Sequence, residues 1–490
     1  MTRRELAAAL LPLAASAQGT EDPILRKAMD AVTAAIPKAE ADPERPVYHF
    51  RPPAQWNNDP NGTIYYKGWH HLFYQLNPYD SVWGHMHWGH ARSRDMVNWE
   101  HLPIALGPSL DKGERHIFSG AAFLAEDGRP RIFYTSIGEK RDPEHWMAIP
   151  EDDDLLRWKK HPRNPILDIK IHGLLKVTDW RDPFLFREGG KTYMVCGGNL
   201  NGRKRGGGSA VQLYESTAGD LSAWKHRGAV FESRDEDTIN FECPNLFKVG
   251  SKWVLIVSPH KPCEYWIGDL DLARARFIPD THGVLDAGSS YASNISYDDK
   301  GRCILWLWGR TATKPGKGWN SCMALPRILT IDAQGWLRQN PAPELESLRG
   351  PVVEFPATAI SEKPLPLPQT ISGDCLELEA QFSAKGATVG MHVRGKTEIS
   401  FNAKDGMLTV GKVKKLLGIG QPVKLRVFLD KRALEVYADD GAAAIFTTVD
   451  AGPQDLGVDL FARGGAGKLD WLKAWSLKPA KFSLERFNLK

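Results

Sequence analysis

Four short polar motifs divide the middle of this 490-residue chain into units of about sixty residues. They are Asn58-Asp59-Pro60-Asn61-Gly62, Phe118-Ser119-Gly120, Arg181-Asp182-Pro183 and Glu242-Cys243-Pro244. Counted from Asp59 through Ser119 and Asp182 to Glu242, the intervals are 60, 63 and 60 residues, and a fifth element begins at Tyr291, 49 residues later. A period of this length, with several short strands in each unit, predicts a five-bladed β-propeller with one four-stranded sheet per blade. A twisted β-sandwich is the alternative.

The strand pattern also predicts how the chain divides into domains. Residues 47–349 consist of short β-branched and aromatic runs between turn residues, and we assign them to the propeller. Residues 350–368 are rich in proline and are expected to form a linker, whereas residues 369–490 resemble an antiparallel β-sandwich. Residues 18–46 are expected to be a helical lead-in of unknown role. The predicted fold class is therefore all-β, with a five-bladed β-propeller followed by a C-terminal β-sandwich.

The first 17 residues are typical of an export signal rather than of a folded segment. Arg3 and Arg4 precede a weakly apolar Ala/Leu-rich stretch, and Ala15-Ser16-Ala17 forms a small-residue cleavage site. The arginine pair favours a twin-arginine signal, so we expect a periplasmic or extracellular protein that is soluble after signal removal. An amphipathic helix that stays attached is the alternative. No other segment has the roughly 18 uninterrupted apolar residues that a membrane span needs.

Composition argues against several classes of function. The 63 basic and 59 acidic residues give a net charge of +4 spread along the chain, which favours no nucleic-acid partner. The six cysteines are widely spaced and contain no C-x-x-C pair, so no zinc site is predicted. The histidines in residues 85–90 lack a carboxylate or cysteine at a matching distance, and no metal is expected there. The 17 tryptophans suit either sugar binding or a Trp-rich core.

Three carboxylates in the motifs have the chemistry needed to break a glycosidic bond. The innermost strand of each propeller blade faces the axial channel, so Asp59, Asp182 and Glu242 would surround one pocket. One carboxylate would attack the anomeric carbon and another would protonate the leaving oxygen, with retention of configuration if they lie roughly 5 Å apart. Taken singly, Asp59 could be a turn residue and Asp182 part of a structural ion pair. Glu242 lies between Phe241 and Cys243, and these apolar neighbours are expected to raise its pKa.

Taken in order, the motifs resemble the signature set of glycoside hydrolase family 32, which includes invertases, levanases, inulinases and fructan exohydrolases. The resemblance covers residues 47–480 and includes the segments between the motifs. Among the segments that carry it are Trp56–Gly62, His71–Gln75, Trp83-Gly84, Trp88–His90, Trp180–Pro183, Leu325–Arg327, Arg426–Asp430 and Leu434–Tyr437. Four positions depart from the common pattern, namely Asn57, Trp180, Ser290 and Leu307. The last two bear on substrate preference rather than on the type of reaction.

The resemblance implies a role for each matching position. Asp59 would be the nucleophile that attacks C2 of fructose, Glu242 the general acid/base, and Asp182 the stabiliser of the oxocarbenium-like transition state. The substrate-binding residues that it implies are Asn58, Gln75, Trp83, Phe118, Ser119, Arg181, Tyr291 and Trp308. It implies no metal and no organic cofactor.

The sequence therefore predicts a retaining β-fructofuranosidase, which hydrolyses terminal fructosyl units of sucrose or of β-fructans such as inulin, levan and fructo-oligosaccharides. The reaction would pass through a covalent fructosyl-enzyme. One alternative is a fructosyltransferase with the same residues, in which an acceptor sugar replaces water. Another is a sugar-binding propeller that has lost catalysis, although all three acids are present. Preferred linkage, exo or endo action, oligomeric state and disulfide pairing are open at this stage.

Overall fold

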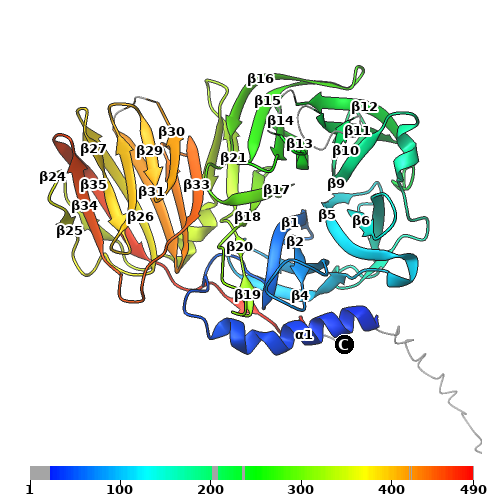
Figure 1. Ribbon diagram of the computed structural model, residues 1–490, viewed down its shortest axis with the longest axis horizontal. Coiled ribbons are helices and arrows are strands. Elements are labelled where there is room, and N and C mark those ends of the chain that lie inside the picture. The colour runs from blue at the N-terminus through cyan, green and yellow to red at the C-terminus, as the bar shows by residue number, and fades with distance from the viewer. Residues whose placement is uncertain are drawn as a thin grey trace, which may run out of the picture.

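The computed structural model describes residues 22–200, 208–233, 235, 238–418, 420 and 422–488. Nearly all of the regular structure in these residues is β (Figure 1). The expected export signal, residues 1–17, lies outside the described residues. In the part of the chain that is described, no helix is long and apolar enough to cross a membrane.

The N-terminal two thirds of the described chain forms five antiparallel sheets, each built around four consecutive or nearly consecutive strands. Their strands are, sheet by sheet, β1 (Gln55–Tyr66), β2 (Trp69–Asn77), β3 (His87–Ser93) and β4 (Trp99–Leu106); β5 (Glu114–Leu124), β6 (Pro130–Gly138), β7 (Glu144–Pro150) and β8 (Trp158–Lys160); β9 (Val177–Glu188), β10 (Lys191–Leu200), β11 (Ser209–Ser216) and β12 (Trp224–Glu232); β13 (Glu242–Val249), β14 (Lys252–Ser258), β15 (Glu264–Asp271) and β16 (Arg276–Val284); and β17 (Ser290–Tyr297), β18 (Cys303–Gly309), β21 (Arg327–Ile331) and β22 (Leu337–Pro341). In the fifth sheet, β20 (Cys322–Met323) also pairs with β18.

The five sheets close into a ring. Their first strands contact one another in the cyclic order β1, β5, β9, β13, β17 and back to β1, and they surround the axis in Figure 1. Strands such as β14 are buried along almost their whole length, because neighbouring blades cover both faces of each sheet. This is why the sequence shows continuous apolar runs instead of a strict alternation. The expected propeller, followed by a β-sandwich, is confirmed.

Two short strands from distant parts of the chain complete the first sheet. β19 (Trp319–Asn320) pairs in parallel with β1, and β36 (Phe482–Ser483) pairs in parallel with the outer strand β4. The first blade therefore contains residues from the start of the propeller, from its fifth blade and from beyond the sandwich.

The C-terminal sandwich consists of two antiparallel sheets around a second apolar core. One sheet contains β23 (Val353–Phe355), β24 (Thr358–Ile360), β26 (Cys375–Ala384), β31 (Val423–Asp430), β32 (Ala433–Ala438), β33 (Ala443–Thr448) and β35 (Gly467–Ser476); the other contains β25 (Leu365–Pro366), β27 (Thr388–Val393), β28 (Thr397–Asn402), β29 (Met407–Val410), β30 (Val413–Leu416) and β34 (Val458–Arg463). Residues 350–368, expected to form a linker, instead supply the short strands β23, β24 and β25. Proline fits there because the three strands lie at sheet edges, where fewer backbone N–H groups are needed.

The helix α1 (Pro23–Glu40) lies along the outer side of the first sheet, beside β4 (Figure 1). Its first turn is capped by Asp22, which accepts a hydrogen bond from the backbone of Ile24, and Pro23 stands where a helix needs no N–H donor. Met29 and Val32 are buried against the first blade, in the same apolar cluster as residues of β2 and β4. Three short 3₁₀ helices complete the described helices: η1 (Leu110–Lys112), η2 (Ile169–His172) and η3 (Pro343–Leu348).

A fully buried cluster of charged residues joins the two domains. Arg327 of the propeller donates to Asp286 at 2.8 Å and to Glu435 of the sandwich at 3.1 Å. His49, which precedes the first blade, lies 2.9 Å from Asp430 and 3.2 Å from Glu435. The Asp430 carboxylate also accepts three backbone N–H groups from residues 47–49. The interface between the domains is therefore held by hydrogen-bonded charges that have no access to water.

Candidate active site

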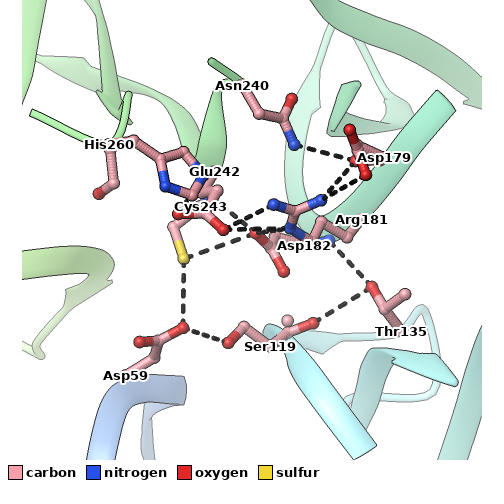
Figure 2. Close-up of polar contacts among 12 residues, drawn as sticks. Asp59, Ser119, Thr135, Asp179, Arg181, Asp182, Asn240, Glu242, Cys243 and His260 are labelled. Atoms are coloured by element: carbon pink, nitrogen blue, oxygen red, sulfur yellow. Dashed lines mark hydrogen bonds and ion pairs between the residues drawn. The ribbon is translucent and has the colours of Figure 1, made fainter. Parts of the chain in front are cut away.

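Each polar motif coincides with an irregularity in the innermost strand of its blade. The pairing register shifts across residues 57–60, 117–120, 181–184, 242–245 and 291–293. Proline at positions 60, 183 and 244 fits these bulges because it cannot donate to the ladder. A bulge bends the strand and redirects the side chain that is left unpaired. The bulges in four of the blades turn Asp59, Ser119, Asp182 and Glu242 toward one another at the propeller axis (Figure 2).

Asp59 is held by side chains from its own blade and from two others. The Ser119 hydroxyl donates to Oδ2 at 2.5 Å, and the Asn58 amide donates to Oδ1 at 3.1 Å. The sulfur of Cys243 lies 3.6 Å from the same Oδ2 atom. Such contacts position a carboxylate in space, whereas an Asx turn would join it to backbone N–H groups nearby in the chain. Burial raises the pKa of Asp59 above its usual range. The hydrogen bonds from Ser119 and Asn58 act to lower this pKa, but burial outweighs them.

Asp182 is fixed in a strained backbone conformation with φ of 65°. Its backbone N–H donates to the Thr135 hydroxyl at 2.9 Å, and its Oδ2 accepts the backbone N–H of Cys243 at 2.9 Å. Arg181 Nε lies 3.9 Å from the same carboxylate. Burial raises the pKa of Asp182 to about 7, although the charge of Arg181 acts to lower it. The side chain is therefore positioned by contacts with two other blades rather than by a surface ion pair.

Glu242 is surrounded by hydrogen-bond donors. Arg181 Nη2 donates to Oε1 at 2.7 Å and Tyr291 donates to Oε2 at 2.6 Å, while His260 Nε2 lies 3.2 Å from Oε2. Burial acts to raise the pKa of Glu242, but the His260 hydrogen bond and the Arg181 charge outweigh it and lower the pKa to about 2. The expectation that its neighbours in the sequence would raise this pKa is therefore wrong, because residues that are neighbours only in space determine it.

The other expected substrate-binding residues lie around the three acids. Gln75 donates to the Ser119 hydroxyl at 3.4 Å. The side-chain oxygen of Asn58 accepts the Trp56 indole N–H at 2.7 Å, and the Trp56 ring packs edge-on against Trp308 at 5.7 Å. These contacts bring Gln75, Asn58 and Trp308 to the same end of the axis as Asp59.

Aromatic side chains form one side of the site's rim. Trp83, which is 52% exposed, lies with its ring centre 6.1 Å from that of Phe118 and 5.3 Å from that of His116. Phe118 directly precedes Ser119, so the aromatic rim begins beside the hydroxyl that binds Asp59. A flat apolar surface next to polar groups is what a sugar ring requires.

The structure adds residues that sequence reasoning missed. His260 lies in the connection between β14 and β15, where Pro259 and Lys261-Pro262 give only the signal of a surface turn. Its backbone N–H donates to the Tyr291 hydroxyl at 2.9 Å, and its ring reaches Glu242. Cys243 belongs to a quoted motif, and its sulfur lies within 3.7 Å of both Asp59 and Asp182.

The residues do not form a metal centre. In residues 22–200, 208–233, 235, 238–418, 420 and 422–488, no group of three or more His, Cys, Asp and Glu side chains could hold a metal ion. The six cysteines are free thiols, and all but Cys375 are buried.

Comparisons with known proteins agree along nearly the whole described chain. Residues 49–341 match the model of the glycosyl hydrolases family 32 N-terminal domain, and residues 344–476 match that of the family's C-terminal domain. The levanase of Bacillus subtilis (strain 168) is 30% identical over 89% of this chain and 70% of the levanase. The insoluble isoenzyme 2 of β-fructofuranosidase from Oryza sativa subsp. indica is 33% identical over 70% of this chain, which spans 63% of that enzyme's length.

Solved structures give the same result. The β-fructofuranosidase of Bombyx mori superposes with a TM-score of 0.76 at 28% identity, over 93% of this chain and 98% of that one. Fructan 1-exohydrolase IIa of Cichorium intybus has the same fold, with a TM-score of 0.80 over 91% of this chain and 99% of that one at 24% identity. The chain is a glycoside hydrolase and belongs to glycoside hydrolase family 32.

Proposed function

We propose that this protein is a retaining β-fructofuranosidase that hydrolyses terminal fructosyl units of sucrose or of β-fructans through a covalent fructosyl-enzyme. The observation that carries the proposal is the meeting of Asp59, Asp182 and Glu242, from three blades, around Cys243 and Arg181. The names of its relatives, levanase and β-fructofuranosidase, support fructosides as the substrate class. We further propose residues 47–349 as the catalytic domain.

Asp59 acts as the nucleophile. Ser119 and Asn58 hold its two oxygens in place, so the carboxylate needs little rearrangement to attack C2 of a bound fructosyl unit. Attack forms an ester bond between Asp59 and C2 and breaks the bond from C2 to the leaving oxygen. Asp182, fixed by the backbone of Cys243, is placed to bind sugar hydroxyls and to stabilise the oxocarbenium-like transition state.

Glu242 acts as the general acid and then as the general base. In the free enzyme the low pKa of Glu242 favours the ionised form, whereas a general acid must carry the proton. Fructosyl hydroxyls that donate to Asp59 and Asp182 stabilise these two carboxylates in their charged forms. Their negative charges then favour a proton on Glu242, where it can pass to the leaving oxygen. Water that is deprotonated by Glu242 hydrolyses the ester in the second step.

Incubation with sucrose, inulin and levan, each followed by chromatography, tests this function. We expect free fructose from at least one of the three substrates. Longer oligosaccharides formed at the expense of free fructose would instead assign a fructosyltransferase. If the folded protein releases no fructose and forms no new sugar from any of them, the proposal is rejected, and a sugar-binding propeller becomes the better description.

Replacement of His260 by alanine is expected to shift the pH dependence of kcat/KM toward higher pH. The substitution removes the hydrogen bond that most strongly lowers the pKa of Glu242, so this pKa rises. The alkaline limb of the profile reports the loss of the proton from Glu242 in the free enzyme, so this limb moves toward higher pH. His282→Ala is the matched control, because this histidine pairs with Glu264 at 3.8 Å on the same blade and is not among the site residues. Superimposable profiles for wild type and His260→Ala would contradict the role of this contact.

We also propose that residues 1–17 are an export signal, so that the enzyme meets free sugars outside the cytoplasm. The arginine pair and the Ala15-Ser16-Ala17 site support this. Expression with the native N-terminus should yield protein outside the cytoplasm that begins after Ala17. Retention of Met1 on all of the protein in the cytoplasm would reject it.

A further inference from the structure

A cavity that is separate from the axial site lies at the same end of the propeller as the three acids. It has a volume of about 950 Å³ and is bounded by the first turn of α1, the β2–β3 connection, the β4–β5 connection and the end of β6. β1 and β5 begin at the end of the ring that carries the acids, and β2, β4 and β6 finish there, since neighbouring strands are antiparallel. The helix that forms one wall precedes residue 49, where the match to the family begins.

The aromatic rim of the active site leads directly to this cavity. Ser119 binds Asp59, and its neighbour Phe118 packs against Trp83 at 6.1 Å. Trp83 packs in turn against His116, which is itself part of the cavity wall. A chain of sugar rings that leaves the axial site along these aromatic faces would therefore enter the cavity.

A buried hydrogen-bond acceptor in the wall has no partner. His87 is 1% exposed, and burial lowers its pKa to about 4, so the ring is neutral at neutral pH. Its Nδ1 lies 2.5 Å from the carbonyl of His85 and must carry the ring proton to bind it. The other nitrogen, Nε2, is then an acceptor, and it has no hydrogen-bond partner within the described residues. Buried acceptors without a partner are rare in folded proteins, and His87 is one of the residues that line the cavity.

The rest of the wall suits a neutral, hydroxyl-rich ligand. The Tyr79 ring lies edge-on to the rings of both His85 and His87, and Lys27 lies over its face at 5.8 Å. The two cations among the lining residues have partners within the wall, because Arg115 pairs with Glu139 at 3.0 Å and Lys27 lies over the Tyr79 ring. An aromatic surface combined with single polar groups is the usual composition of a sugar-binding site.

We propose that this cavity binds the distal fructosyl units of a fructan chain whose terminal unit occupies the axial site. The inference rests on the proposed function and adds to it a preference for substrates longer than a disaccharide. Sucrose is too short to reach beyond the aromatic rim, whereas a longer chain gains contacts with Tyr79 and His87. Helix α1, which the family model does not include, then serves to build a wall of the substrate-binding surface.

Two variants test the cavity through the dependence of kcat/KM on chain length. Tyr79→Ala removes the aromatic face, and His87→Phe keeps a ring but removes the acceptor nitrogen. We expect kcat/KM for inulin or levan to fall about tenfold in each, while kcat/KM for sucrose changes less than twofold, as for loss of one good contact. Unchanged sucrose turnover also demonstrates that the variant has folded. Tyr66→Ala is the matched control, because this half-buried tyrosine also carries a lysine over its ring but lies at the opposite end of β1.

The result separates the two proposals. If the wild-type enzyme releases no fructose from sucrose, inulin or levan, the proposed function itself has failed. If the wild type is active and the variants lose activity equally on sucrose and on the fructans, or lose none on either fructan, the cavity does not bind distal sugars and the inference is overturned.

Discussion

Replacement of Asp59 by alanine should lower kcat by about 10⁴-fold or more on every substrate that the wild type cleaves. Without this carboxylate no ester to C2 can form, and the remaining groups can supply only binding and a proton. The variant should nevertheless fold at least as well as the wild type. Asp59 is buried with a raised pKa, so its charge is destabilising in the folded protein. Initial rates and thermal unfolding, measured on the same preparation, test both expectations.

Azide provides a sharper readout for Asp59→Ala. A small anion can occupy the space of the lost carboxylate and attack C2 of an activated fructoside directly, giving a fructosyl azide of inverted configuration. The matched control is Asp179→Ala, since this aspartate lies beside the site, where it pairs with Arg181 at 3.8 Å, but its side chain is 44% exposed. We expect that control to keep kcat within about tenfold of wild type. A tenth or more of wild-type activity in Asp59→Ala would exclude it as the nucleophile.

Replacement of Arg327 by methionine should lower the free energy of unfolding by about 3–5 kcal/mol. The side chain is fully buried, and its removal leaves the Asp286 and Glu435 carboxylates without their common counter-ion. Arg274→Met is the control, since this arginine is 83% exposed in its pair with Asp271 and should contribute less than about 1 kcal/mol. Urea unfolding of both variants measures the difference.

The double variant Arg327→Met, Glu435→Gln should lose less free energy of unfolding than the sum of the two single variants, because the second change removes an unpaired charge. If Arg327→Met unfolds at the same urea concentration as the wild type, the buried charges do not stabilise the interface between the domains.

The same cluster makes stability depend on pH at both ends of the range. Burial acts to raise the pKa of Glu435, but Arg327 and His49 lower it to about 2, so its contribution is complete above 4.5 and is lost as the pH falls through about 2. Burial acts to lower the pKa of His49, but Asp430 and Glu435 raise it to about 9, so its contribution is complete below 6.5 and is lost as the pH rises through about 9.

The sequence predicted the fold and the three acids because each motif is local and recurs once per blade. A proline one or two residues after an acid within a strand pattern marks a bulge, and bulges of this kind placed Asp59, Asp182 and Glu242 at the axis. What the sequence could not predict depends on contacts between segments far apart in the chain. His260 reaches Glu242 only because the fold brings the β14–β15 connection within 3.2 Å of that carboxylate, and the pKa of Glu242 was therefore predicted in the wrong direction.

The domain interface and the cavity were not predicted from the sequence either. Arg327 and Glu435 both lie in segments that resemble the family, but they are more than a hundred residues apart, and nothing in either segment indicates that the two side chains pair. The acceptor on His87 is visible only once its other nitrogen is seen to bind a backbone carbonyl. Two-residue strands such as β19 are also beyond a pattern-based prediction, because a period of two needs a longer run to be recognised.

The parallel pairing of β36 with β4 affects how the protein folds during its synthesis on the ribosome. β4 is synthesised early, yet the short strand that pairs with the first two residues of its outer edge arrives almost four hundred residues later. Until then the first blade exposes an unpaired edge to other nascent chains, which is a recognised route to aggregation. The first blade to be translated is consequently the last to be finished, and a version shortened after the sandwich would leave this end of the β4 edge permanently unpaired.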